Sequence, residues 1–445
     1  MSAAKQKALK AIRGMNDLLP SQSDQWLDVE ATIAKIVSDY GYKQIRTPIV
    51  ESTQLFARSI GADTDIVSKE MYTFEDRNGD SLTLRPEGTA SCVRAGIEHG
   101  LLYNQQQRLW YMGPMFRHER PQKGRYRQFH QLGVECYGWT SADIEAEVIG
   151  LAEHLFRALG LQNWRLEINN LGDTETRSRY RLELQKYFGE HFEQLDKDSQ
   201  NRLESNPLRI LDSKSPTTRK IADSAPSIID FLSPESTQHL ADLELYLQAL
   251  EIPYTINPAM VRGLDYYNDT VFEFICDDFG AQATVCGGGR YDGLVEQLGG
   301  PVSPAFGFGL GLERLVQILA EQQDTPSLEK QPSVFIVSDG KAARAQAIVL
   351  RSELAESGIS SVMAMGDASF KNQFKRADKS GALIALIVGE QEVSSKTVSI
   401  KVLRSVEGAS VNDQWVKALL DNTGEQVSIP RPSVIDKVTN LLDSL

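Results

Sequence analysis

The chain has 445 residues, of which 41% are hydrophobic and 24% are charged, and its formal net charge is -13. This length exceeds one core of ordinary size and predicts two or three domains, while the acidic balance argues against a protein that coats nucleic acid. The sequence has no run of about 18 apolar residues and no apolar segment of signal-peptide length, so we expect a cytoplasmic protein without a membrane span. The cysteines are scattered, which predicts buried thiols and no metal site at Cys92, Cys136, Cys276 and Cys286.

The first 100 residues predict antiparallel strands with interspersed helices. A helix is expected between a cap at Ser23 or Asp24 and Gly41, and its apolar stripe consists of Trp26, Val29, Ile33, Ile36 and Val37. Residues 43–52 predict a short strand interrupted by Pro48, which is typical of an edge or an interface. Residues 70–100 predict a hairpin with an Asn-Gly turn and then a helix. This pattern favours an α+β fold over a doubly wound sheet.

The rest of the chain predicts a helical insertion, a linker and a second domain. Residues of about 173–258 are charged and have helical spacing, and strand-rich sequence resumes only after them. Residues 321–332 are polar and contain two prolines, so we place a first domain at 1–325 and a linker at 326–332. From 333 to 445 strands and helices alternate, which predicts a small α/β domain.

The segment 116–127 is basic although the chain as a whole is acidic. Its cations are Arg117, His118, Arg120, Lys123, Arg125 and Arg127, and its single acid is Glu119. Pro121 and Gly124 predict a loop in its middle. Guanidinium groups match phosphate oxygens in geometry and charge, so the segment indicates a phosphate site. A solvated charged turn is the usual alternative.

The strand expected at 128–137 has two different faces, because alternate residues of an extended chain point to opposite sides. One face is apolar and suits a core; it consists of Leu132, Val134 and Cys136. The other consists of Phe129, Gln131, Gly133, Glu135 and Tyr137. We expect this second face to form the floor of a pocket, in which Gly133 leaves room for a ligand between Gln131 and Glu135. The alternative is an ordinary ion pair between Glu135 and a nearby arginine.

Three further strings carry polar or glycine-rich patterns. Glu87 lies at a strand-to-helix turn, where it could hold an ammonium group or cap the helix. In RGLDYYNDTVFEF, Arg262 precedes Tyr266 and Tyr267 just before an expected strand, so this string is a further candidate site segment. The alternative role of the two tyrosines is core packing. GFGLGLERL, residues 307–315, resembles a dinucleotide-binding fingerprint only loosely, because its third glycine comes too early. The alternative for this glycine cluster is close packing of a strand against a helix.

Together these strings resemble the class II aminoacyl-tRNA synthetases over nearly the whole chain. GYKQIRTPIVES, FRHERPQKGRYRQFHQLGVECYG and GFGLGLERL resemble the three motifs of that class, and RGLDYYNDTVFEF and GGGRYDGL resemble signatures of its histidine–tRNA ligase family. The resemblance implies an antiparallel sheet with flanking helices, a helical insertion and a C-terminal α/β anticodon-binding domain. It also implies a homodimer with the segment around Pro48 at its interface. The stretch 410–445 is longer than the ending usual in this family.

The resemblance also implies a role for each candidate residue. The α-phosphate of ATP would be held by Arg117 and by Arg262, which would lie where other members of the class place a metal ion. Phe129 and Arg314 would stack on adenine, and Arg125 would reach the outer phosphates together with Mg²⁺. Histidine would be bound by Glu87, Gly88, Thr89, Gln131, Glu135, Arg262, Tyr266 and Tyr267. The tRNA acceptor end would be approached by Arg120, Gln122 and Lys123.

The function implied by the resemblance is ATP-dependent ligation of L-histidine to tRNA(His) through a histidyl-adenylate, with release of AMP and pyrophosphate. One alternative is the regulatory subunit of ATP phosphoribosyltransferase, which resembles this catalytic core and is not itself a synthetase. That protein generally lacks the anticodon domain and has degraded motifs, whereas Arg117, Arg262 and Arg314 are all in place here. A non-enzymatic RNA-binding module, the other alternative, does not account for the histidine-type strings.

Overall fold

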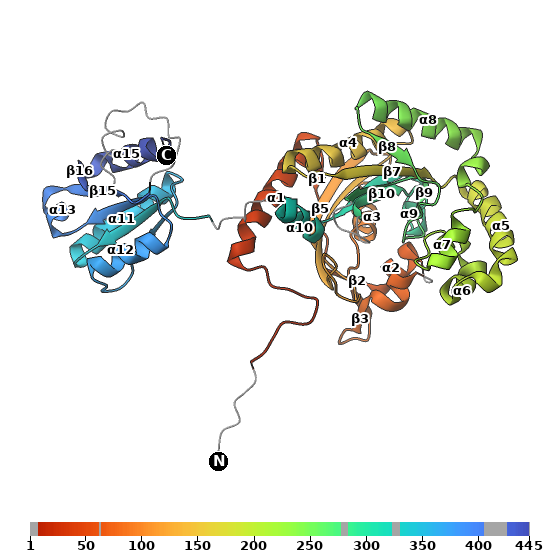
Figure 1. Cartoon of the computed structure of the whole chain (residues 1–445), viewed down its shortest axis with the longest axis horizontal. Helices are drawn as coiled ribbons and strands as arrows, with labels where there is room; N and C mark the ends of the chain where they lie inside the picture. The colour runs from red at the N-terminus through yellow and green to blue at the C-terminus, as the bar shows by residue number, and fades with distance from the viewer. Residues whose placement is uncertain (1–7, 62–63, 277–283, 323–329, 405–424, 445) are drawn as a thin grey trace, which may run out of the picture. The chain divides into compact units, whose positions relative to one another are not determined.

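The computed structural model describes residues 8–61, 64–276, 284–322, 330–404 and 425–444 (Figure 1). The chain divides into two compact units, Met1–Ser327 and Leu328–Leu445, and each unit has its own hydrophobic core. Within the described residues, no helix combines the length and the apolar character that crossing a bilayer requires. The four cysteines are buried free thiols, as their scattered spacing predicted.

The first unit is organised around an eight-stranded sheet with the strand order β1-β5-β6-β11-β10-β9-β7-β8. Its central strands pair antiparallel; they are β5 (Gln107–Phe116), β6 (Gln128–Tyr137), β11 (Ala305–Gly311), β10 (Thr284–Arg290), β9 (Asn268–Cys276) and β7 (Trp164–Asn170). The edge strands β1 (Lys43–Gln44) and β8 (Tyr254–Ile256) pair parallel with β5 and β7. The predicted α+β fold with an antiparallel sheet is therefore confirmed.

Four long helices pack on this sheet in the main core: α1 (Pro20–Asp39), α4 (Ala142–Leu159), α8 (Pro234–Ala249) and α10 (Leu312–Gln322). The predicted stripe of α1 is buried from Trp26 to Val37, and the predicted apolar face of β6 lies in the same cluster. The predicted cap is wrong, because α1 begins at Pro20 and already includes Ser23 and Asp24. Proline suits the first helical position, where its missing N–H is not needed.

The segment predicted as one strand interrupted by Pro48 forms two strands in different sheets. β1 joins the large sheet, whereas β2 (Val50–Ser52) pairs with β4 (Ser81–Leu84), which also pairs with β3 (Tyr72–Glu75). The hairpin of β3 and β4 and the helix α3 (Thr89–Glu98) agree with the prediction. The short helix α2 (Thr53–Ile60) packs against α3. Two further short helices lie beside them: η1 (Ile66–Glu70) contacts α2, and α9 (Leu294–Gln297) contacts both α2 and α3.

Between β7 and β8 the chain forms the predicted helical insertion. Its helices are α5 (Thr174–Glu190), η2 (Phe192–Gln194), α6 (Lys197–Ser205), η3 (Pro207–Ile210), α7 (Pro216–Ala222), η4 (Ile228–Phe231) and α8. Asp173 caps α5 by accepting from the backbone N–H of Thr176. The buried side of α5 joins a second core cluster that also contains Tyr266 and Tyr267. The insertion therefore shares a core with a segment that carries candidate site residues.

The second unit is a five-stranded sheet with the order β13-β12-β14-β15-β16. Its elements are β12 (Val334–Ser338), α11 (Lys341–Glu356), β13 (Ser361–Met363), α12 (Phe370–Lys379), β14 (Ile384–Val388), α13 (Glu390–Ser395), β15 (Thr397–Val402), β16 (Val427–Pro430), η6 (Arg431–Ser433) and α15 (Val434–Leu442). The first three strands pair parallel and the last two antiparallel. Of the long ending at 410–445, β16 and α15 pack into this core, while residues 410–424 lie outside the described part.

The centre of the large sheet predicts a stability effect at Gly288 of β10. A Cβ there would lie 2.7 Å from the Cα of Phe308 and closer still to the carbonyl oxygen of Gly307 on β11. Replacing Gly288 with alanine is expected to lower the free energy of unfolding of the first unit by about 1–3 kcal/mol, because backbone atoms must shift. Urea denaturation measures this change. Gly189→Ala is the matched control. Gly189 lies in α5, and a Cβ added there would meet no neighbouring residue within 4 Å, so we expect no loss of stability.

Candidate active site

A cavity of about 340 Å³ lies over the middle of the large sheet in the first unit. Most of the predicted site residues line it, namely Glu87, Thr89, Arg117, Arg125, Phe129, Gln131, Arg262, Tyr266, Tyr267 and Arg314. Glu119 and Glu313 also line it, and the sequence did not single them out for a site. Among the other predicted residues, Gly88 and Glu135 lie beneath the cavity wall, whereas Arg120, Gln122 and Lys123 are exposed.

The floor of the cavity is cleared by glycines on β10 and β11. A Cβ on Gly309 would collide with the side chain of Gln131, and a Cβ on Gly307 would collide with the carboxylate of Glu135. A Cβ on Gly287 would lie 2.7 Å from Nη1 of Arg262. The polar side chains can therefore lie across the neighbouring strands. The glycine cluster at 307–311 is a strand that makes this room; it opens no dinucleotide-binding turn, and its close contacts are with a strand.

The basic segment forms a hairpin loop between β5 and β6. Arg117 N donates to the carbonyl oxygen of Arg127 at 2.9 Å, and Gln122 and Arg125 form a reciprocal backbone pair at the tip. Lys123 at the tip forms an ion pair with Glu321 at 2.7 Å. The loop is therefore more than a solvated turn, because Arg117 and Arg125 face the cavity. Its tip faces solvent.

Three arginines converge on one side of the cavity: Arg117, Arg125 and Arg314. Arg117 donates to the carbonyl oxygen of Pro86 at 2.8 Å and lies over the ring of Phe129, 5.3 Å from its centre. Arg314 donates to the carbonyl oxygen of Gly124 at 3.3 Å. Burial lowers the pKa of Arg117, and burial together with Arg125 and Arg117 lowers the pKa of Arg314. Guanidinium groups stay protonated, so this crowding of positive charge favours a bound anion.

Glu87 caps a helix, which is one of the two roles that its position allowed. Its carboxylate accepts from the backbone N–H groups of Thr89 at 2.7 Å and Ala90 at 2.9 Å, and so caps α3. It also lines the cavity. Burial raises the pKa of Glu87, while the two backbone N–H donors and Arg117 favour its anion. A positively charged ligand group beside it would further stabilise the charge.

Arg262 and the two tyrosines come from the segment that leads into β9. Arg262 forms an ion pair with Glu273 of β9 and lies over the ring of Tyr267, 5.5 Å from its centre. Although burial disfavours its charge, Glu273 and the tyrosines hold the pKa of Arg262 above its ordinary value. Tyr266 and Tyr267 belong to a core cluster, so the core packing weighed for them applies, and both also line the cavity.

Two arginines of the helical insertion hold the backbone of this segment. Arg177 of α5 donates to the carbonyl oxygen of Tyr267 at 2.8 Å. Arg209 of η3 donates to the carbonyl oxygen of Gly263 at 2.6 Å and forms an ion pair with Asp265 at 3.6 Å. The sequence gives no local signal for these contacts, because the partners are more than 50 residues apart. The insertion thus positions part of the cavity wall.

The prediction that Gly133 leaves room for a ligand is wrong. Gly133 of β6 lies directly opposite Tyr111 of β5, and the ring of Tyr111 fills the space where a Cβ would be. The same ring covers Gly88. The sequence missed Tyr111 because cross-strand register decides the contact, and register cannot be read from β6 alone.

Glu135 is 1% exposed and accepts hydrogen bonds in place of an arginine pair. Its Oε1 accepts from Thr89 at 2.8 Å and from Tyr111 at 3.0 Å, and its Oε2 accepts from Tyr291. Burial raises the pKa of Glu135 to about 8, and the hydrogen bonds from Tyr291, Thr89 and Tyr111 oppose that rise. The ion-pair alternative for Glu135 is not what the structure shows.

The chain matches two known protein families. The family described as histidyl-tRNA synthetase matches residues 14–315, and the anticodon binding domain matches residues 333–441. Among solved structures, the chain is 37% identical to the apo histidyl-tRNA synthetase of S. aureus, with a TM-score of 0.78 over 97% of this chain and 100% of that chain.

Two more distant structures share the fold. The histidyl-tRNA synthetase of Nostoc is 20% identical, with a TM-score of 0.68 over 98% of this chain and 100% of that chain. A Bacillus halodurans protein described as an ATP phosphoribosyltransferase regulatory subunit/histidyl-tRNA synthetase is 21% identical, with a TM-score of 0.63 over 86% of this chain and 99% of that chain. Because the family match at 14–315 covers more than half of the sequence, the chain belongs to the histidyl-tRNA synthetase family.

Proposed function

We propose that this histidine–tRNA ligase works in two steps in the cavity over the large sheet. In the first step, the carboxylate of L-histidine attacks the α-phosphate of ATP, forming histidyl-adenylate and releasing pyrophosphate. In the second step, a terminal ribose hydroxyl of tRNA(His) attacks the acyl-adenylate and releases AMP. One observation carries this proposal: a cluster of arginines lines the same cavity as polar side chains of RGLDYYNDTVFEF, the segment that resembles a histidine–tRNA ligase signature.

The first step needs positioning and charge cancellation more than a protein base, because the attacking carboxylate is already an anion. Arg117 and Arg262 would hold the α-phosphate, and Arg125 would reach the outer phosphates. Phe129, already beneath the guanidinium of Arg117, would stack on adenine together with Arg314. Mutual repulsion among these arginines supports the proposal, since phosphate oxygens would relieve it.

Mg²⁺ would accompany the outer phosphates and neutralise part of their charge. This ion prefers oxygen ligands and usually takes one or two carboxylates in addition to substrate phosphates. Glu119 and Glu313 line the cavity and supply such oxygens. Glu119 also pairs with Arg125, and both oxygens of Glu313 accept from the backbone N–H of His130. Each carboxylate still keeps an acceptor position that fits the ion. These two carboxylates would hold it beside the basic loop.

Histidine would lie on the other side of the cavity. Glu87 and Thr89, with Gly88 beneath them, would bind its ammonium group, and Gln131 would lie beside it. Glu135, Tyr266 and Tyr267 would surround the imidazole. A site that hydrogen-bonds both ring nitrogens leaves its own polar groups unsatisfied against an apolar side chain, so discrimination by about 10⁴ needs no editing domain.

The tRNA would contact both units of the chain. Arg120, Gln122 and Lys123 at the exposed loop tip would approach its acceptor end, and the second unit would bind its anticodon. In this assignment, residues 1–325 form the catalytic domain, with its insertion at about 173–258, 326–332 the linker and 333–445 the anticodon-binding domain. We also propose a homodimer with Pro48 at its interface.

The decisive experiment is amino-acid-dependent ATP–pyrophosphate exchange, run separately with each of the twenty amino acids. We expect histidine alone to stimulate exchange, and charging of tRNA(His) to follow when tRNA is added. Greater stimulation by another amino acid would refute the assignment. An absence of exchange with every amino acid would instead support the regulatory-subunit alternative, against which the match to an anticodon binding domain at 333–441 now counts.

A further inference from the structure

The Glu135 carboxylate is surrounded by three hydroxyl donors. Thr89 and Tyr111 donate to Oε1, at 2.8 Å and 3.0 Å, and Tyr291 donates to Oε2. An ionised carboxylate has about four acceptor positions. Three donors therefore leave room for one more, which suits a single ring N–H of an imidazole.

Tyr291 lies behind the cavity wall rather than in it. It is 1% exposed, and the residues that line the cavity do not include it. Its ring makes edge-to-face contacts with Tyr266, at 5.6 Å between ring centres, and with Tyr267, at 6.4 Å. One side chain thus contacts both cavity tyrosines and the buried carboxylate.

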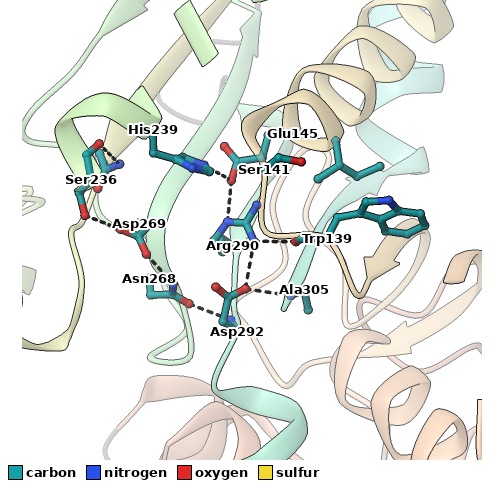
Figure 2. Close-up of polar contacts among 12 residues, drawn as sticks. Trp139, Ser141, Glu145, Ser236, His239, Asn268, Asp269, Arg290, Asp292 and Ala305 are labelled. Atoms are coloured by element: carbon teal, nitrogen blue, oxygen red, sulfur yellow. Dashed lines mark hydrogen bonds and ion pairs between the residues drawn. The ribbon is translucent and has the colours of Figure 1, made fainter. Parts of the chain in front are cut away.

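The residue before Tyr291 anchors the same strand end on the opposite side of the sheet. Successive residues of a strand point to opposite faces, and Arg290 points toward α4 and α8 (Figure 2). Its Nε donates to Glu145 Oε1 at 2.6 Å, and its Nη1 donates to the carbonyl oxygen of Trp139 at 3.1 Å. The same oxygen of Glu145 lies 2.8 Å from Nε2 of His239. This buried cluster ties β10 to two helices.

The residue after Tyr291 is held in the same way. Asp292 accepts from Arg290 at 3.2 Å and from the backbone N–H of Ala305 at 2.8 Å, and its own N–H donates to Asn268 at 2.8 Å (Figure 2). Tyr291 N donates to the carbonyl oxygen of Ala305 at 2.8 Å. The backbone on both sides of Tyr291 is therefore fixed, and its hydroxyl has a fixed target.

We propose that Tyr291 and Tyr111 are positioning residues of the histidine subsite, which hold the Glu135 carboxylate so that one acceptor position is left for the imidazole. The Arg290–Glu145 pair fixes Tyr291 from the opposite face. This inference rests on the proposed function and adds two residues to it. It explains why a pattern such as GGGRYDGL places Arg and Tyr side by side: one anchors the strand, and the other orients the carboxylate.

The first test is Tyr291→Phe, which keeps the ring and removes the donor. In ATP–pyrophosphate exchange we expect the KM for histidine to rise about tenfold or more, because a hydrogen bond to a charged group is lost. The KM for ATP is expected to stay within about twofold, because Tyr291 does not contact the phosphate side. Tyr111→Phe is expected to give the same split between the two substrates.

Tyr180→Phe is the matched control. Tyr180 is also 1% exposed and in the same core cluster, but its hydroxyl donates to the carbonyl oxygen of Pro226 at 2.9 Å. A general loss of packing would affect this variant and raise both KM values in parallel. Equal KM values for histidine in wild type and Tyr291→Phe, or a parallel rise for ATP and histidine, would overturn the inference.

The pH profile supplies a readout that a purely structural role would not move. The titratable groups that face Glu135 are Glu87, Cys92, Tyr111, Tyr137, Tyr266, Tyr267 and Tyr291. Cys136 is its neighbour on the opposite face of β6. Removing a donor that favours the anion raises the pKa of Glu135 further above its value of about 8. The increase of kcat/KM for histidine with pH is therefore expected at higher pH in Tyr291→Phe than in wild type.

The two proposals fail in different ways. If histidine stimulates exchange in the wild-type protein but the profile and the KM of Tyr291→Phe are unchanged, only the positioning role is refuted. If histidine does not stimulate exchange in the wild-type protein, the proposed function is refuted and this inference with it.

Discussion

Replacing Arg262 with alanine is expected to slow histidyl-adenylate formation by about 10²–10³-fold, the usual effect of removing one preorganised group from a developing negative charge. Arg262 lines the cavity, and Gly287 provides the space in which its guanidinium lies. Its guanidinium is charged before ATP binds, and the ion pair with Glu273 holds it in place. Histidine-dependent ATP–pyrophosphate exchange measures the effect.

The matched control is Arg157→Ala. Arg157 is on α4 with 70% of its side chain exposed, and its ion pair with Glu153 spans 3.9 Å, so exchange should be unaffected. An unchanged circular dichroism spectrum would show that Arg262→Ala still folds, which matters because the substitution leaves Glu273 without this partner. A near-normal exchange rate in a folded Arg262→Ala protein would contradict the proposed role.

Removing the second unit is expected to separate the two steps. A chain that ends at residue 325 retains both core clusters around the large sheet, so adenylate formation should stay within about threefold of the full-length rate. Charging of tRNA(His) should fall by about 10²-fold or more, because the second binding module no longer adds to the first. The measurement compares pyrophosphate exchange with tRNA charging on the same preparation.

The full-length protein with Lys123→Ala is a useful comparison for this truncation. Lys123 is at the exposed loop tip, where the acceptor end is proposed to bind, so its loss should weaken charging more than exchange. The truncation should lower tRNA charging more than Lys123→Ala does. Equal survival of both activities in the truncated chain would show that the second unit has no part in tRNA binding.

Local patterns predicted the secondary structure and the polarity of single elements. Alternation along β6 separated an apolar face that is buried from a polar face that carries Phe129 and Gln131 in the cavity. The basic loop and the glycine strand were also visible in the sequence. The identity of the ligands came from the resemblance to a family, since alternation shows which side a residue faces and not what it binds.

Contacts between distant segments could not be predicted in this way. Tyr111 fills the space above Gly133 because of the register between β5 and β6, and Tyr291 contacts Glu135 across β11. Arg177 and Arg209 approach from the helical insertion. Each of these contacts depends on tertiary packing, which one sequence does not specify.

The glycines of β10 and β11 have a consequence for the stability of the sheet itself. Six of the fourteen residues in these two strands are glycine, a residue that costs about 0.5–1 kcal/mol in the middle of a strand relative to alanine. Together they amount to about 3–6 kcal/mol, a large part of the stability of an ordinary domain. The strands beneath the cavity are thus intrinsically poor strands that persist because their neighbours hold them. A Cβ at five of the six positions would collide with a neighbouring atom, whereas a Cβ at Gly311, which lines the cavity, would meet no atom within 4 Å. A variant selected only for heat resistance would therefore tend to fill the space at Gly311 and narrow the cavity.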